Sequence, residues 1–153
     1  LCREREGGRL FCRLGDLLSA DGPAFDLVLC LDVFEHVEDY LGFLRRLRAK
    51  GRRFVFHVPL DLSAQSIVRG RPIQKAREGV GHLHYFTKDT ALATLQSAGY
   101  AIDDWRYTAG SLDLPDQSAW QRIARVPRRL GLALVPDLTV RVLGGCSLLV
   151  LAR

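Results

Sequence analysis

The sequence has no apolar run long enough to cross a membrane and no recognisable secretion signal. Its longest apolar stretch, residues 143–152, is far shorter than the ~20 residues that a spanning helix needs. Charged residues break up the first nine positions, which excludes the apolar core of a signal peptide. The four cysteines are widely spaced and form no C-x-x-C pair, so the spacing of a zinc ribbon or a dithiol redox motif is absent. We therefore expect a cytoplasmic protein without a transmembrane segment.

The charge and hydrophobic content are not extreme. A hydrophobic fraction of 48% and a charged fraction of 25% are typical of a soluble globular protein, and 153 residues suffice for one domain. The net charge of +5 comes from arginines scattered over several segments, without interleaved aromatic residues. We interpret this charge as a solvated basic surface and expect no nucleic-acid partner. The sequence predicts a single domain over residues 1–153.

Segments with strand and helix patterns alternate along the chain. The predicted strands are residues 9–14, 25–31, 53–59, 100–107 and 146–152, and the predicted helices are residues 38–50, 63–78 with breaks at Gly70 and Pro72, and 88–98 with Thr87 as its N-cap. The nearly continuous apolar run FDLVLCL is typical of a parallel strand buried on both faces. This alternation predicts an α/β sheet that is mostly parallel, with an antiparallel C-terminal strand beside residues 100–107.

An arginine-rich helical insert precedes the last strand, at about residues 111–143. Its residues 118–134 are amphipathic, and we expect Pro127 to interrupt them. Asp137 is predicted to cap a short helix that Gly144 and Gly145 end.

Acidic residues and a histidine gather where the predicted strands end. Asp16, Asp32, Glu35, His36 and Asp61 all follow a strand directly or within a few residues. Ligands of open α/β sheets bind outside the carboxyl ends of the strands, so these side chains are candidates for a binding site. Asp32 and Glu35 also fit a second role, since acids stabilise the N-terminus of a following helix.

Taken together, these segments resemble the class I S-adenosylmethionine-dependent methyltransferases, in particular the group with a D-V-[FL]-E-H-V motif after its fourth strand. The resemblance rests on six segments: GDLL (15–18), FDLVLCLDVFEHVEDY (25–40), HVP (57–59), GHLHYFT (81–87), SAGY (97–100) and the closing SLLVLA (147–152). It implies a Rossmann-like fold and S-adenosylmethionine as cofactor.

The resemblance also implies roles for individual residues near the cofactor. By this comparison Asp16 accepts a hydrogen bond from the adenine amino group, and Leu17 packs on the ring. Asp32, Val33 and Phe34 match the motif that lies against the methionine end of the cofactor. His36 matches the residue that anchors the following helix and borders the pocket, with Glu35 as its partner or as a helix cap.

Two histidines in the loop GHLHYFT are the candidates for catalysis. His82 and His84 are suited to removing a proton from the acceptor or to contacting it, because this loop borders the acceptor pocket in the family that the sequence resembles. They also fit a structural role in packing the loop. A metal site is the least favoured interpretation, because no further cysteine or acid of suitable spacing lies nearby. His57 could face either the core or the pocket.

Part of the pattern of this family is missing. The first strand with its G-x-G loop and the second strand with its ribose-binding acid have no counterpart, and the sequence contains no methionine. We therefore expect an N-terminally truncated sheet, in which residues 25–31 lose a neighbouring strand and expose an edge.

Three hypotheses for function follow. The first is a methyltransferase acting on a small molecule, a lipid or a sugar, with Phe34, Tyr85, Phe86 and Trp120 either around the acceptor or in the core. The alternative is a non-catalytic interaction module, a degenerate methyltransferase fold that binds an acidic partner or a membrane surface through the insert arginines, Arg122, Arg125, Arg128 and Arg129. A dinucleotide oxidoreductase is disfavoured, because DVFEHV and GHLHYFT have no place in its pattern. The oligomeric state is not encoded in any of these motifs.

Overall fold

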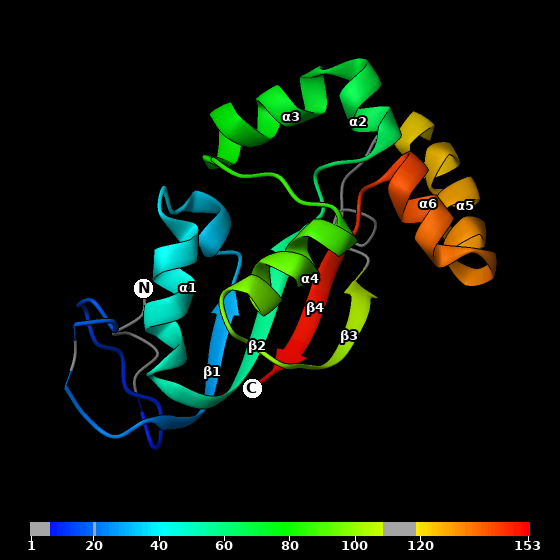
Figure 1. Ribbon diagram of the computed structural model, residues 1–153. Coiled ribbons are helices and arrows are strands. Elements are labelled where there is room, and N and C mark those ends of the chain that lie inside the picture. The colour runs from blue at the N-terminus through cyan, green and yellow to red at the C-terminus, as the bar shows by residue number, and fades with distance from the viewer. Residues whose placement is uncertain (1–6, 20, 109–118) are drawn as a thin grey trace.

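A four-stranded sheet forms the centre of the computed structural model, which describes residues 7–19, 21–108 and 119–153. Its strands are β1 (Phe25–Leu31), β2 (Gly51–Pro59), β3 (Ile102–Thr108) and β4 (Ser147–Ala152). They lie in the order β1-β2-β4-β3 (Figure 1). β1 and β2 are parallel, whereas β4 runs antiparallel to both of its neighbours. The predicted α/β sheet with one reversed C-terminal strand is thereby confirmed.

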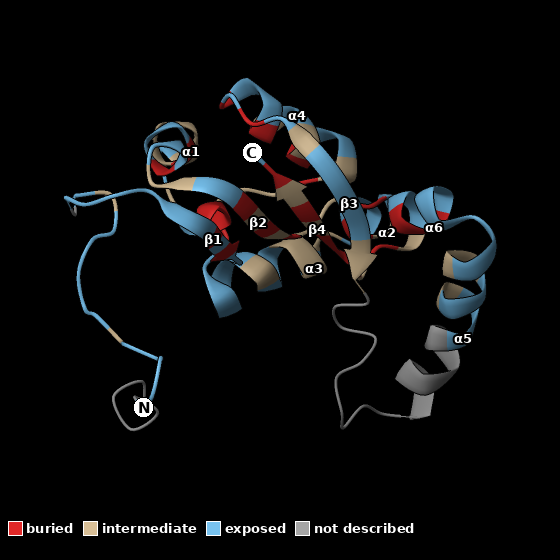
Figure 2. Cartoon of the chain, turned by 90° about the horizontal axis from the view of Figure 1, so that it is seen from below, coloured by how far each residue is buried: buried red, intermediate tan, exposed pale blue. Residues whose placement is uncertain are grey.

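Two helices cover one face of this sheet. Figure 2 shows α1 (Tyr40–Arg48) and α4 (Lys88–Ser97) on the same side of the strands. Asp39 caps α1 by accepting a hydrogen bond from the Gly42 amide at 2.9 Å, and Thr87 caps α4 in a capping box with Thr90, as predicted. Gly99 has a φ of +97° just past α4, the left-handed conformation that ends the helix.

The core lies between these two helices and the sheet. Every second residue of β2 and β4 points into it, which is the period expected of strands. Its largest fully buried apolar side chains are Phe34, Phe54, Phe56, Leu44, Leu95, Leu148, Val58 and Val150. The Tyr100 hydroxyl donates a 2.8 Å hydrogen bond to the Leu44 carbonyl, which links the start of the β3 segment to α1. Burial raises the pKa of this phenol above its ordinary value.

The other face of β1 is open. Phe25, Leu27, Leu29 and Leu31 alternate with the buried Val28 and Cys30, and all four are about half exposed. The expectation that this strand is buried on both faces is therefore wrong. β1 is also an edge strand, as expected, and no strand precedes it in the part of the chain that the structure describes.

The predicted strand over residues 9–14 does not form. This segment makes a single antiparallel bridge, between Gly7 and Leu10, and is otherwise without regular structure. Phe11 and Leu14 are exposed there. Alternating apolar residues alone do not make a strand when no neighbouring strand supplies hydrogen-bond partners.

Short helices lie beyond the carboxyl ends of β1 and β2. They are α2 (Ala64–Arg69), α3 (Arg71–Lys75) and η3 (Ala76–Val80), and they arch over this edge of the sheet in Figure 1. Gly70, with a φ of +64°, separates α2 from α3, and Pro72 lies in the first turn of α3. The predicted break is confirmed at Gly70, whereas Pro72 lies inside the first turn of α3 and interrupts no helix.

The segment before β4 contains two helices, α5 (Ala119–Leu134) and α6 (Pro136–Leu143). Pro127 lies inside α5 and does not interrupt it, contrary to expectation. Packing of α5 on α6 offsets the lost hydrogen bond, and Gly131 lies so close to Thr139 that an added Cβ would collide with it. Residues 109–118, at the start of the expected insert, lie outside the described residues.

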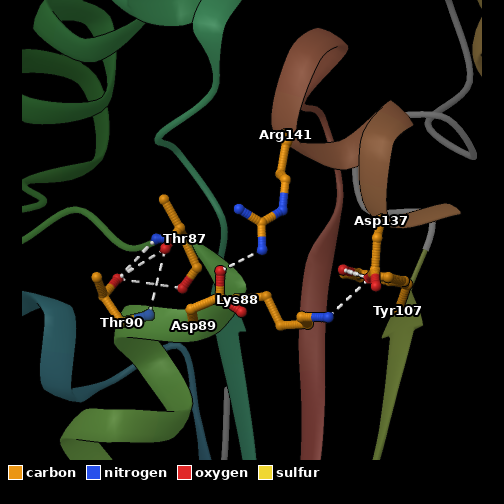
Figure 3. A network of polar contacts seen from close by, with 7 residues as sticks. All are labelled: Thr87, Lys88, Asp89, Thr90, Tyr107, Asp137 and Arg141. Carbon is orange, nitrogen blue, oxygen red and sulfur yellow. Dashed lines mark hydrogen bonds and ion pairs between the residues drawn. The ribbon is translucent and has the colours of Figure 1, made fainter.

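A polar network fixes α6 to α4 and β3 (Figure 3). Asp137 accepts hydrogen bonds from the Lys88 ammonium at 2.7 Å and the Tyr107 hydroxyl at 2.6 Å, and Arg141 donates to Asp89 at 2.6 Å. The Lys88 ammonium also lies 4.6 Å from the centre of the Trp105 ring. The prediction that Asp137 caps α6 is therefore wrong. Its carboxylate pairs with these groups instead, and the N-cap position is Val135.

Candidate functional site

The candidate site begins at the residue that follows β1. Asp32 has a φ of +51°, a left-handed conformation that aspartate tolerates better than most residues. Its amide donates a hydrogen bond to the His57 carbonyl at 3.0 Å, so the chain turns out of the sheet there. The Asp32 side chain is 52% exposed. Its carboxylate is therefore available to a ligand at the carboxyl edge of the sheet.

A chain of hydrogen bonds crosses this edge from Asp32 to β3. His57 Nδ1 lies 2.7 Å from the Asp32 carboxylate, and His57 Nε2 lies 3.0 Å from the Thr108 hydroxyl. The carboxylate accepts the Nδ1 proton, which leaves Nε2 to accept the hydroxyl proton of Thr108. His57 therefore faces the site and fixes the orientation of Asp32. The sequence left the direction of His57 open, because it depends on the pairing of Leu31 with His57 across β1 and β2.

Asp16 lies in a tight turn and keeps its carboxylate at the surface. It accepts hydrogen bonds from the Ser19 hydroxyl at 2.7 Å and the Leu18 amide at 2.9 Å. These two bonds, the Ser19 bond foremost, hold the pKa of the Asp16 carboxyl below its ordinary value. Asp16 is thus an ionised acceptor with a fixed orientation.

An apolar hollow joins Asp16 to the end of β1. It has a volume of about 250 Å³ and lies between the turn at residues 15–18, β1 and α1. Leu17, Leu18 and Val33 line it together with residues of β1 and α1. The structure therefore brings together Asp16, Leu17 and Val33, three of the residues that sequence analysis assigned to the cofactor.

The next turn buries two of the predicted site residues. η2 (Phe34–His36) is a short 3-10 turn, and the Phe34 side chain is completely buried against Phe56, Phe86 and Tyr40. Phe34 therefore belongs to the core and cannot offer its ring to a ligand, which corrects the expectation for this side chain.

Glu35 is also completely buried, and it caps no helix. Among the described residues, neither of its carboxylate oxygens has a hydrogen-bond partner. Burial raises the pKa of this carboxyl, and the charge of Asp32 adds to the effect. His36 lies beside it, with Nε2 4.0 Å from the Glu35 carboxylate and Nδ1 3.0 Å from the Gly81 carbonyl.

The loop at residues 81–87 is fastened to this turn. The amides of Leu83 and His84 both donate to the Glu35 carbonyl, at 2.8 and 3.1 Å. His84 Nε2 lies 3.0 Å from the Val37 carbonyl and 3.2 Å from that of Glu38, so this nitrogen carries a proton and donates it. His84 thereby anchors the loop through its ring.

His82 lies in a different environment, although it is only two residues away. Its ring is buried and contacts His36, with ring centres 4.9 Å apart. Its Nδ1 donates to the Asp61 carboxylate at 2.6 Å, which leaves an electron pair on Nε2. Of the two loop histidines, His82 is thus the one that can accept a proton or bind a cation.

A second hollow lies where β2 ends and β4 begins, and it contains Arg128. The Arg128 guanidinium donates to the Gln65 side chain at 2.7 Å and to the Leu143 carbonyl at 3.0 Å. This arginine thus holds α5 against α2 and the end of α6. The side chains of Arg122, Arg125 and Trp120 lie outside the described residues.

Comparison with known proteins gives the following matches. Residues 5–104 match the family model described as a methyltransferase domain. A search of the curated proteins finds no match. Within residues 7–19, 21–108 and 119–153, no helix has the length and apolar character needed to span a membrane.

Several solved structures share the fold at low sequence identity. A S-adenosylmethionine-dependent methyltransferase from Archaeoglobus fulgidus superposes with a TM-score of 0.51 at 15% identity, over 90% of this chain and 65% of its own. The [4+2]-cyclase SpnF superposes with a TM-score of 0.55 at 19% sequence identity. The match covers 92% of this chain and 55% of SpnF. The cyclopropane synthase MmaA2 from Mycobacterium tuberculosis superposes with a TM-score of 0.52 at 15% sequence identity. The match covers 85% of this chain and 56% of MmaA2. The chain spans about 55% to 65% of the length of these three structures.

Proposed function

This chain belongs to the methyltransferase domain family, and from that premise we propose that the carboxyl edge of its sheet binds S-adenosylmethionine for methyl transfer to a small-molecule, lipid or sugar acceptor. S-adenosylmethionine is the methyl donor of this family. The observation that carries the proposal is the apolar hollow beside the Asp16 carboxylate, which extends from Leu17 to Val33, the residue that follows Asp32. We further propose that residues 1–153 act as one methyltransferase domain, with the segment at about residues 111–143 as an insert.

The described residues fit the two ends of this cofactor. Asp16 has an ionised, oriented carboxylate that can accept the adenine amino group, and Leu17 and Val33 supply an apolar surface for the ring and the neighbouring groups. Asp32 places a negative charge where the methionine end is proposed to lie, and the cofactor carries a positive sulfonium. His36 borders the same edge through its contact with the Gly81 carbonyl. Phe34 would contribute through its backbone alone.

The chemistry asked of the protein is mainly positioning. The bound donor supplies a methyl group that is already activated by its sulfonium. The protein then has to hold the acceptor in line with this methyl group and keep water out. His57 keeps Asp32 in one orientation, and His84 fixes the loop at residues 81–87 beside it. His82 is our candidate for contact with the acceptor, because its Nδ1 is bonded to Asp61 and its Nε2 makes no such bond.

The interaction-module hypothesis has less support in the described residues. It needs arginines that are available to a partner, yet Arg128 is bonded within the protein. The solved neighbours include a protein named as a cyclase, so the shared fold by itself does not fix the reaction. For this chain the methyltransferase proposal rests on the family match and on the site.

Substitution of Asp16 tests the adenine end of the proposed site. We expect Asp16→Asn to weaken binding of S-adenosylhomocysteine about tenfold, because an amide oxygen is a poorer acceptor than an ionised carboxylate, and a single acceptor oxygen cannot keep both the Ser19 and the Leu18 bonds. Isothermal titration calorimetry of the wild-type protein and the variant measures this ratio.

A matched control lies at the far edge of the sheet. Asp104 is an exposed aspartate on β3, paired with Arg106, and Asp104→Asn should leave the affinity unchanged. Equal affinities for all three proteins would show that Asp16 does not contact the cofactor. If the folded wild-type protein does not bind S-adenosylhomocysteine, the proposed cofactor site is contradicted.

A further inference from the structure

Three potential metal ligands meet beside the proposed cofactor site. The ligating atoms of Glu35, His36 and His82 all lie within 4.8 Å of one another. Glu35 and His36 come from the turn after β1, and His82 comes from the loop that is bonded to this turn. Sequence analysis did not predict this grouping, since His82 lies 46 positions from His36 in the sequence.

Both histidines are held in the form that a metal ion needs. His36 donates its Nδ1 proton to the Gly81 carbonyl at 3.0 Å, and His82 donates its Nδ1 proton to the Asp61 carboxylate at 2.6 Å. In each ring the electron pair is therefore on Nε2. Hydrogen bonds of this type orient the histidine ligands of metal sites and raise their basicity.

Glu35 supplies an independent indication of a ligand. It is fully buried, and in the described part of the chain both of its carboxylate oxygens lack a hydrogen-bond partner. A buried carboxylate without partners is strongly unfavourable, so a native protein normally satisfies it. In the part of the chain that the structure describes, its ion-pair partner is His36 alone, with Nε2 4.0 Å away. A cation between Glu35 and the two histidines would satisfy it.

We propose that Glu35, His36 and His82 bind a divalent transition-metal ion of the Zn²⁺ type. Two imidazole nitrogens and one carboxylate oxygen form a donor set that suits such ions and leaves at least one coordination position open. Asp61 and Gly81 are the supporting residues behind the two histidines. Two of these ligands, His36 and His82, are also the residues proposed above for the cofactor edge and the acceptor contact, so a bound ion would lie at that same edge. Binding of the ion requires neither the cofactor nor an acceptor, and it can be measured without them.

The geometry requires a small closure around the ion. With bonds of about 2.1 Å, tetrahedral ligand atoms lie roughly 3.4 Å apart, so the three side chains must approach one another by about an ångström. The His36 side chain is 35% exposed and gives the ion a route from solvent, whereas Glu35 and His82 form the buried side of the site.

Titration with Co²⁺ and Zn²⁺ tests the proposal on untagged protein. We expect one ion per chain, with the visible absorption of Co²⁺ bound to nitrogen and oxygen and without an intense thiolate-to-cobalt band, which would indicate a cysteine site. Zn²⁺ should displace Co²⁺ and raise the melting temperature. Mg²⁺ should bind at least 100-fold more weakly, because it prefers oxygen ligands.

Variants assign the ion to these residues. Glu35→Gln should weaken Co²⁺ binding more than 100-fold, and Asp61→Asn should weaken it 10-fold to 100-fold. Glu38→Gln changes an exposed acid in the same segment and should bind as the wild type does. Circular dichroism confirms that each variant is folded. A folded wild type that binds neither ion, or equal binding by the wild type and Glu35→Gln, would overturn the proposal.

Discussion

Replacement of Phe56 by alanine is expected to lower the free energy of unfolding by about 3 to 5 kcal/mol. Phe56 is completely buried at the centre of β2, and its ring packs against Phe34, Phe54 and Tyr100 at centroid distances of 6.3, 6.0 and 5.0 Å. Removing the ring leaves a cavity among these aromatic side chains, which cannot all move inward to fill it. The loss is a large part of the 5 to 15 kcal/mol that typically stabilises a domain. Urea denaturation measures it.

Phe25→Ala is the matched control for this core substitution. Phe25 lies on the neighbouring strand, in the same sheet, but it is 53% exposed on the open face of β1. We expect its replacement to change the free energy of unfolding by roughly 1 kcal/mol or less. If Phe56→Ala is too unstable to purify, Phe56→Leu should show a smaller loss in the same direction. Equal effects at residues 25 and 56 would contradict a core on one face of the sheet.

Replacement of Asp32 by asparagine should weaken the binding of S-adenosylmethionine about tenfold, but it should weaken the binding of S-adenosylhomocysteine less than threefold. The first ligand carries a sulfonium charge and the second does not, so loss of a nearby carboxylate acts mainly on the first. A tenfold change is about 1.4 kcal/mol, a modest part of the attraction between unit charges near a protein surface. Asparagine also tolerates the left-handed backbone of residue 32 and still accepts the His57 proton.

The ratio of the two affinities separates charge from shape. Calorimetric titration of both ligands into the wild-type protein and into Asp32→Asn measures this ratio, and Asp104→Asn on β3 controls for the change in net charge. An equal loss for both ligands would show that Asp32 acts by shaping the site. No loss for either would place the methionine end elsewhere.

Hydrophobic periodicity was sufficient to predict most of the fold. β1, β2 and α4 follow patterns that local sequence specifies, with Thr87 and Gly99 marking the limits of α4. The failures are those in which tertiary contacts decide. Residues 9–14 have a strand pattern but no neighbour, and Pro127 is tolerated because α5 packs on α6.

The sequence indicated part of the candidate site but not its contacts. The position of Asp32 directly after β1 follows from the order of elements, whereas Asp16 follows no strand, because residues 9–14 do not form one. The burial of Phe34 and Glu35 depends on a 3-10 turn that no sequence pattern indicated. His57 and Asp61 act through hydrogen bonds to residues 21 to 51 positions away, which depend on strand register and loop packing.

A crystal structure of the protein with S-adenosylhomocysteine is the most direct test of a cofactor site at the end of β1. We expect the adenine in the hollow beside Leu17, its amino group within hydrogen-bond distance of the Asp16 carboxylate, and the sulfur next to Asp32. A ligand bound instead in the hollow beside Arg128, or contacts that include neither aspartate, would contradict this assignment.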